Sequence, residues 1–165
     1  MSQLASSHVE ASAATLIDPR GPQFTAALTS VVLAVVLLTA PGAIATVLLG
    51  LQALAFAVAA SLGVTRTPHA WLFRRLVRPR LGAPAHLEDS APPQFAQAVG
   101  FAFAIVGLIG FLSGATVVGL VATGLALGAA LLNAVFGFCL GCEIYLLALR
   151  AGAPSAGRSA SRTTT

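Results

Sequence analysis

The chain has 165 residues but only two cysteines, which lie three positions apart in the segment Cys139-Leu-Gly-Cys142. This spacing allows a local disulfide and is typical of redox motifs. It also suits two ligands of a metal site. If a helix begins here, its first N–H groups would favour a thiolate and make the sulfur reactive. Cys139 and Cys142 are therefore the first candidate catalytic residues, acting as a dithiol.

Glu143 follows Cys142 directly and is the only acidic residue after Asp89. Its carboxylate could take or give a proton at a thiol, and its charge would raise the pKa of a nearby cysteine. Pairing with an arginine of the central loop is the alternative role. A metal site needs about four ligands, and His69 and His86 are the side chains that could complete one. The sequence leaves the metal, and whether the chain is an enzyme, open, and it predicts no cofactor.

The composition indicates that these residues belong to a membrane protein. Hydrophobic residues make up 57% of the chain and charged residues 8%, whereas a soluble domain has about 25% charged residues. Two segments without any charge, 21–65 and 90–142, contain 45 and 53 residues. One membrane crossing needs about 20 residues of helix. Each uncharged segment is therefore long enough for two crossings.

Residues that end helices lie near the middle of each uncharged segment, at Pro41-Gly42 and at Ser113-Gly114. The sequence therefore predicts an all-α integral membrane protein with four helices. The expected crossings are about 23–40, 43–63, 94–112 and 115–136. A membrane domain at 18–150 is expected between two flexible tails at 1–17 and 151–165.

The two halves of the chain resemble each other. Three pairs of segments match in the same order at offsets of 70 to 72 residues: Asp18-Pro-Arg-Gly-Pro-Gln-Phe24 with Asp89-Ser-Ala-Pro-Pro-Gln-Phe95, Pro41-Gly-Ala43 with Ser113-Gly-Ala115, and Arg80-Leu-Gly-Ala-Pro84 with Arg150-Ala-Gly-Ala-Pro154. We expect two helical hairpins that form a parallel internal repeat. The pseudo-twofold axis of such a repeat runs along the membrane normal.

Each hairpin is expected to be followed by a short interfacial helix. After the first hairpin, the segment 68–78 begins with a proline and mixes apolar residues, including Trp71, with arginines. The alternative is an ordinary loop helix that packs on the bundle. After the second hairpin, one helix over 115–149 would be about 52 Å long, but the hydrocarbon core is about 30 Å thick. We therefore expect a bend near Gly137 to Gly141 and a new helix beginning near the cysteines.

The charges predict the orientation and the surroundings of the chain. All nine basic residues are arginines, and they lie in the amino tail, the central loop and the carboxyl tail. Because cytoplasmic loops are enriched in basic residues, both termini should be cytoplasmic, in a cell membrane. The arginines favour anionic lipid over nucleic acid as their partner. The small-residue spacing of Gly110 and Gly114 fits packing within the chain or in a homo-oligomer.

Three stretches resemble a known bacterial membrane family: Asp18 to Phe24, Pro92 to Phe95, and Phe136 to Tyr145. The family is common in actinobacteria and is defined as a domain of unknown function, DUF4395. The likeness covers about residues 16–150, and the cysteine stretch is its most specific part. It implies a small polytopic membrane protein with a Cys-x-x-Cys near the end, and a thioredoxin-like or sulfurtransferase partner.

We therefore predict a membrane thiol-redox or sulfur-relay component at the cytoplasmic face. Cys139 and Cys142 would cycle between dithiol and disulfide, or carry a persulfide. A disulfide in the reducing cytoplasm would be transient, which favours a catalytic or sensing pair. The sequence does not define which cysteine attacks first. The alternatives are a transporter for a small solute such as a sulfur species, a non-catalytic membrane scaffold, and a metal-bound dithiol.

Overall fold

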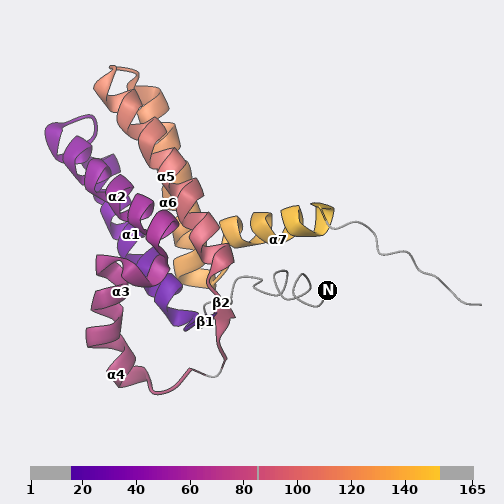
Figure 1. Ribbon diagram of the computed structural model, residues 1–165. Helices are drawn as coiled ribbons and strands as arrows, with labels where there is room; N and C mark the ends of the chain where they lie inside the picture. The colour runs from indigo at the N-terminus through magenta and orange to yellow at the C-terminus, as the bar shows by residue number, and fades with distance from the viewer. Residues whose placement is uncertain (1–15, 85, 153–165) are drawn as a thin grey trace, which may run out of the picture.

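The fold is built on four long helices: α1 (Arg20–Thr39), α2 (Ala43–Leu62), α5 (Ala91–Leu112) and α6 (Thr116–Phe136). The computed structural model (Figure 1) describes residues 16–84 and 86–152. Nearly all of both predicted tails lies outside the described residues. Each long helix is apolar and long enough to cross a membrane. The predicted all-α membrane fold is confirmed.

Two of these helices begin three residues before the predicted crossings, and the cause is the same in both. Asp18 Oδ1 accepts a hydrogen bond from the N–H of Arg20 at 3.0 Å, and Asp89 Oδ1 accepts one from the N–H of Ala91 at 3.0 Å. A side-chain oxygen at a helix start satisfies an N–H group that has no partner within the helix. The aspartates therefore allow α1 and α5 to begin early.

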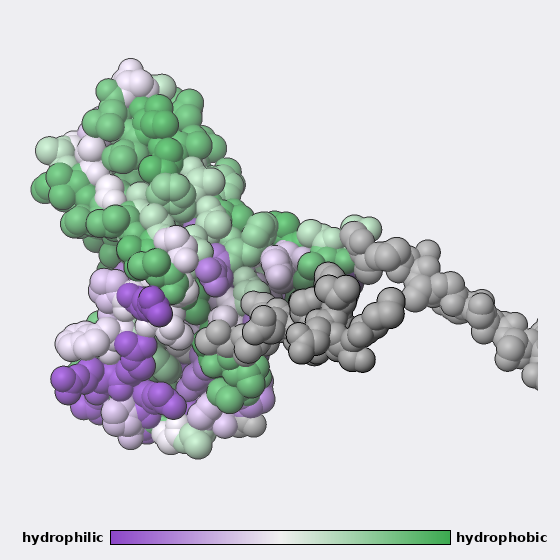
Figure 2. Space-filling view, in the orientation of Figure 1, coloured by the Kyte–Doolittle hydropathy of each residue, from purple (hydrophilic) through white to green (hydrophobic). Residues whose placement is uncertain are grey.

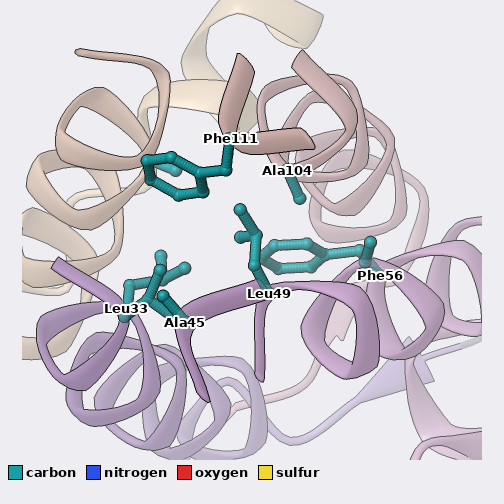
Figure 3. Packing of buried hydrophobic residues seen from close by; sticks show 9 residues of the cluster. Leu33, Ala45, Leu49, Phe56, Ala104 and Phe111 are labelled. Atoms are coloured by element: carbon teal, nitrogen blue, oxygen red, sulfur yellow. The ribbon is translucent and has the colours of Figure 1, made fainter. Parts of the chain in front are cut away.

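The four long helices form a bundle in which α1 lies beside α2 and α6, and α5 lies beside the same two helices. Its interior is apolar and includes Leu33, Leu49, Phe56 and Phe111 (Figure 3). Large apolar side chains also cover the outside, and Leu38 is 86% exposed. Figure 2 shows an apolar surface along the bundle and hydrophilic residues gathered at one end. This distribution fits a bundle surrounded by hydrocarbon, with its polar end in the headgroup region.

The segment after α2 forms a run of short helices at the polar end of the bundle: η1 (Val64–Arg66), α3 (Pro68–Leu72), the π-helix η2 (Phe73–Val77) and α4 (Arg78–Leu81). The predicted helix at 68–78 is therefore present and begins at Pro68. The π-helix was not predicted. Trp71 is exposed, and the guanidinium of Arg75 lies 5.8 Å from the centre of its ring, as in a cation–π pair.

The predicted bend after the fourth long helix is also present. Gly137 has a φ of +66°, its N–H donates to Asn133 O, and the N–H of Phe138 donates to Leu132 O. This is a left-handed helix end that glycine adopts without strain. The last helix, α7 (Leu140–Gly152), then runs crosswise to the bundle (Figure 1).

The same glutamine contact occurs once in each half. Gln23 of α1 donates to the carbonyl of Ala134, at 3.2 Å, and Gln94 of α5 donates to the carbonyl of Ala60, at 2.7 Å. Each acceptor is the third residue from the end of its helix, where carbonyls lack partners within the helix. Each glutamine therefore joins the start of one hairpin to the end of the other.

An aromatic pair is likewise repeated. Phe24 packs on Phe73 with ring centres 5.7 Å apart, and Phe95 packs on Tyr145 with ring centres 5.6 Å apart, both tilted by 44°. The first pair fixes η2 on α1, and the second fixes α7 on α5. These contacts support the predicted duplication, which itself stays a prediction.

A short antiparallel ladder joins the two halves. It pairs β1 (Leu16–Ile17) with β2 (Glu88–Asp89), and Ile17 lies opposite Glu88. The ladder differs from the prediction, since β1 lies within the predicted amino tail and no strand was expected. Because the offset from Ile17 to Glu88 is 71 residues, this pair lies where a twofold axis between the halves would pass.

Candidate functional site

The start of α7 positions both cysteines. Cys139 immediately precedes the first residue of α7, and its carbonyl accepts the N–H of Glu143 at 3.1 Å. Cys139 is therefore the N-cap residue, and Cys142 lies in the first turn. Both side chains are half-buried free thiols. Gly141 lies so close to α5 that an added Cβ would be 2.6 Å from the Cβ of Ala96, so α7 is held tightly at this point.

The surroundings of Cys139 favour its thiolate. A hydrogen bond from the Cys142 thiol is the largest cause that lowers the pKa of Cys139, to about 7. The backbone N–H groups of Cys142 and Gly141 lower this pKa further, whereas burial and the charge of Glu143 raise it. Hydrogen bonds to a charged form stabilise that form. Cys139 is therefore the better nucleophile near neutral pH.

Cys142 has the opposite character. Its proton is held in the hydrogen bond to the Cys139 sulfur, which raises the pKa of Cys142 far above its usual range. Burial and the charges of Cys139, Glu88 and Glu143 raise the pKa of Cys142 further. The arrangement therefore separates a thiolate from a proton donor within one motif.

The cysteines face a cavity of about 670 Å³, which we call the dithiol groove. The starts of α1 and α5, the segment around β2 and the end of α6 enclose it together with α7. The polar or reactive side chains that line it include Gln23, His86, Glu88, Asn133, Cys139 and Cys142. His86 Nε2 lies 3.1 Å from Glu88 Oε1, and both side chains are more than half exposed.

The candidate residues of the sequence analysis come together in part. Cys139, Cys142 and Glu143 all line the dithiol groove, and His86 does too. His69 lies on α3 and is not part of the groove lining. In residues 16–84 and 86–152, Glu143 forms no ion pair with an arginine.

The metal hypothesis finds little support in the side-chain arrangement. Within the described residues, no group of three or more His, Cys, Asp or Glu side chains lies close enough together to hold a metal ion. The two cysteines could supply at most half of a four-ligand set.

Sequence reasoning missed Gln23, Glu88 and Asn133 as groove residues. A signal for Gln23 was present, because Pro-Gln-Phe occurs at the start of both α1 and α5. The motif was read as evidence of a repeat and not as a contact to the end of another helix. For Glu88 and Asn133 no local pattern marks the residue, since the fold alone brings them to the cysteines.

A family model described as a domain of unknown function (DUF4395) matches residues 17–150. The chain belongs to this family. The matched stretch includes the four long helices and both cysteines, so the dithiol groove is a feature of the DUF4395 domain in this chain. No curated protein and no solved structure matches the chain.

Proposed function

We propose that this DUF4395 protein is a membrane-bound dithiol–disulfide exchange component, with Cys139 as the attacking thiolate and Cys142 as the resolving thiol. The observation that carries the proposal is the position of Cys139 at the start of α7. There the Cys142 thiol and the backbone N–H groups of the first turn lower the pKa of Cys139. This environment favours a reactive thiolate.

The reaction is a two-electron exchange. The Cys139 thiolate attacks one sulfur of a partner disulfide, a mixed disulfide forms, and the other partner sulfur leaves as a thiolate that takes up a proton. Cys142 then loses its proton and attacks the Cys139 sulfur. A Cys139–Cys142 disulfide forms, and the second partner sulfur leaves as a thiol. The cysteine pair is oxidised and the partner disulfide is reduced, and the reverse reaction follows the same steps.

The partner in this proposal is a cytoplasmic thioredoxin-like or sulfurtransferase-like protein. The groove lies at the polar, arginine-rich end of the bundle, which we assign to the cytoplasm because basic residues mark cytoplasmic loops. Its volume of about 670 Å³ lies within the usual size of ligand sites, about 300–1,000 Å³. An extended segment of a protein or a small disulfide would fit.

The alternatives receive less support from the packing. The interior of the bundle is filled by apolar side chains such as Leu33, Leu49 and Phe111, which favours chemistry at the end of the bundle over passage of a solute through it. A non-catalytic scaffold also has no need of two cysteines at a helix start beside a cavity. A scaffold predicts that a variant without both cysteines keeps full function in the cell.

Reaction with oxidised glutathione tests the assignment of roles. The full chain in membranes is treated with this disulfide, and thiols are then counted by alkylation and mass spectrometry. We expect an internal disulfide in the wild type and a stable mixed disulfide with glutathione in Cys142→Ser, which keeps the nucleophile but lacks the resolving thiol.

Cys139→Ser is the matched control, and it should react at least about tenfold more slowly, because burial and the charges of Glu88 and Glu143 still raise the pKa of Cys142. Equal reaction rates of the two single variants would overturn the assignment of Cys139. A wild type that forms no internal disulfide would overturn the proposed function. A membrane-impermeant maleimide, applied to intact cells and to opened cells, tests the orientation, and labelling of Cys139 in intact cells would contradict it.

A further inference from the structure

A second cavity, of about 280 Å³, lies at the equivalent place in the first half of the chain. We call it the arginine groove. Its lining includes Thr67, Ala70, Phe73, Arg74, Arg78 and Leu87. Thr67 lines this groove, and Cys139, 72 residues later, lines the dithiol groove. Ala70 and Arg74 of the arginine groove correspond in the same way to Cys142 and Leu146 of the dithiol groove, at an offset of 72 residues.

The equivalence extends to a hydrogen bond. Thr67 is the N-cap residue of α3, and its hydroxyl oxygen accepts the N–H of Ala70 at 3.1 Å. Cys139 is the N-cap residue of α7, and its carbonyl accepts the N–H of Glu143 at 3.1 Å, just as the Thr67 carbonyl accepts the N–H of Trp71 at 3.0 Å. The two helix starts therefore have the same backbone arrangement, but the arginine groove has no thiol and has Arg74 where the dithiol groove has Leu146.

The arginine groove carries an excess of positive charge. Arg74 and Arg78 lie one turn apart, and Arg74 Nη1 donates to the carbonyl of Thr65 at 2.6 Å, which fixes the guanidinium at the groove. In the described part of the chain, neither guanidinium forms an ion pair with a carboxylate. Asp18 is the one acidic residue of the lining, and its Oδ1 accepts the N–H of Arg20. The groove thus presents two cations and one anion.

The rest of the arginine groove is apolar. Ile17 and Phe73 are buried, and Leu87 and Ala59 also line the cavity. Arg74 and Arg78 lie in the short helices that follow α2, at the end of the bundle where hydrophilic residues gather (Figure 2). A site with guanidinium groups at one side and apolar walls at the other fits an anionic amphiphile better than a free inorganic anion.

We propose that the arginine groove binds a phosphodiester that carries an apolar chain, with the phosphate between Arg74 and Arg78 and the start of the chain against Phe73. An anionic phospholipid is the source of this chemistry in a bilayer. Guanidinium groups bind phosphate oxygens through short, charge-assisted hydrogen bonds, often in pairs. This site adjoins the dithiol groove, since Pro22 and Gln97 line both cavities, but it contains neither cysteine and does not depend on their chemistry.

Native mass spectrometry of the full chain in detergent, titrated with dioleoylphosphatidylglycerol, tests the proposal. We expect one saturable lipid per chain. Arg74→Gln and Arg78→Gln should each weaken this binding by about tenfold or more, because each removes a hydrogen bond to a charged group. Arg75→Gln is the matched control, since Arg75 lies on the same segment but over Trp71 and outside the groove. We expect a change of less than about twofold for it.

A second variant tests the cavity itself without a change of charge. Ala70→Leu places a larger side chain in the groove and should abolish saturable binding, with folding checked by thermal unfolding in the same detergent. If a folded Ala70→Leu variant binds the lipid as well as the wild type does, the proposal that the lipid occupies this cavity is wrong. An equal loss in Arg75→Gln would also overturn it, because the binding would then be diffuse attraction to the surface.

Two further ligands distinguish the sources of the phosphate. Dioleoylphosphatidylcholine should bind much more weakly, and sn-glycerol 3-phosphate should fail to displace the anionic lipid at equal concentration. Displacement by sn-glycerol 3-phosphate would assign the groove to a free phosphate ester and overturn the role of the apolar chain. Equal binding of the two lipids would overturn the selection for negative charge. A variant without both cysteines should keep the lipid, so this result is independent of the proposed redox function.

Discussion

The dithiol groove and the arginine groove lie at places that correspond under the predicted repeat, but different chemistry lines them. Thr67 and Ala70 of the first half correspond to Cys139 and Cys142 of the second, and both first members are N-cap residues. The contacts that build each groove are also alike, a glutamine to a helix end and a tilted aromatic pair. The same backbone arrangement at a helix start can therefore hold a capping hydroxyl or a reactive sulfur, depending on two side chains.

The two grooves differ in the helix that covers them. The segment from α3 to α4 is interrupted by the π-helix η2 and places two guanidinium groups beside the cavity, whereas α7 is one regular helix that follows the turn at Gly137. The unpaired N–H groups of a new helix start are what stabilise a thiolate. In the first half, the corresponding N–H group is satisfied by the Thr67 hydroxyl.

The largest expected effect comes from making the second groove like the first. The double variant Cys139→Thr with Cys142→Ala gives the start of α7 the same Thr–Ala pair as the start of α3. Disulfide exchange should be lost completely, while the helix cap remains. The free energy of unfolding should change by no more than about 1 kcal/mol. Alkylation after treatment with oxidised glutathione and thermal unfolding in detergent measure the two quantities. A large loss of stability would show that the cysteines are chiefly structural.

The reverse exchange should create thiol chemistry in the arginine groove. In the variant without native cysteines, Thr67→Cys with Ala70→Cys should form an internal disulfide with oxidised glutathione, because the backbone places both residues as in α7. Mass spectrometry counts the thiols that remain. Thr67→Cys alone is the control and should stop at a mixed disulfide. If the double variant also stops there, the two frameworks are not equivalent.

A smaller effect is expected on the pH dependence of the nucleophile. The pKa of Cys139 is about 7. The rate of alkylation by iodoacetamide should therefore be close to its maximum above pH 8, and it should fall as the pH drops through 7. Cys142→Ala removes the hydrogen bond that lowers this pKa most, so the pKa should rise toward the usual value of about 8.5. At pH 7 the rate should then fall about tenfold. An unchanged profile would show that Cys142 does not stabilise the thiolate.

The smallest effect concerns the glutamines that join the halves. Gln23→Ala and Gln94→Ala each remove one hydrogen bond to a helix end, and each should lower the free energy of unfolding by about 1 kcal/mol. Because the two hydrogen bonds share no donor or acceptor residue, the double variant should show about the sum of the two losses. Thermal unfolding in detergent gives these values. If only one of the two variants loses stability, the two glutamine contacts are not equivalent.

Much of the fold could be predicted because lipid restricts the options so strongly. Two long uncharged segments, each broken by Pro-Gly or Ser-Gly, can only form helices that span the hydrocarbon. The long helices begin and end within three residues of the expected limits. The bend at Gly137 could be predicted for a similar reason, since a continuous helix would be too long for the bilayer.

The site was predictable only in its residue types. Cys139 and Cys142 are the sole thiols, so they attract attention in any reading of the sequence. Their different roles depend on which of them caps α7, and that is a property of the backbone. The arginine groove and the correspondence of Thr67 with Cys139 were missed, because a hydroxyl and a thiol share no local pattern although they occupy the same place in a turn.

The turns that close the two hairpins at 40–42 and 113–115 carry no charged residue, and α6, with its 21 residues, separates the cysteines from the second turn by about 31 Å. Disulfide exchange needs direct contact between sulfur atoms, so a dithiol at one end of this bundle can serve partners on one side only. The protein would therefore exchange disulfides with partners at one surface of the membrane and would not transfer anything across it. A partner that is itself attached to the same membrane would search for it in two dimensions, where confinement raises the effective concentration and even a weak encounter becomes frequent.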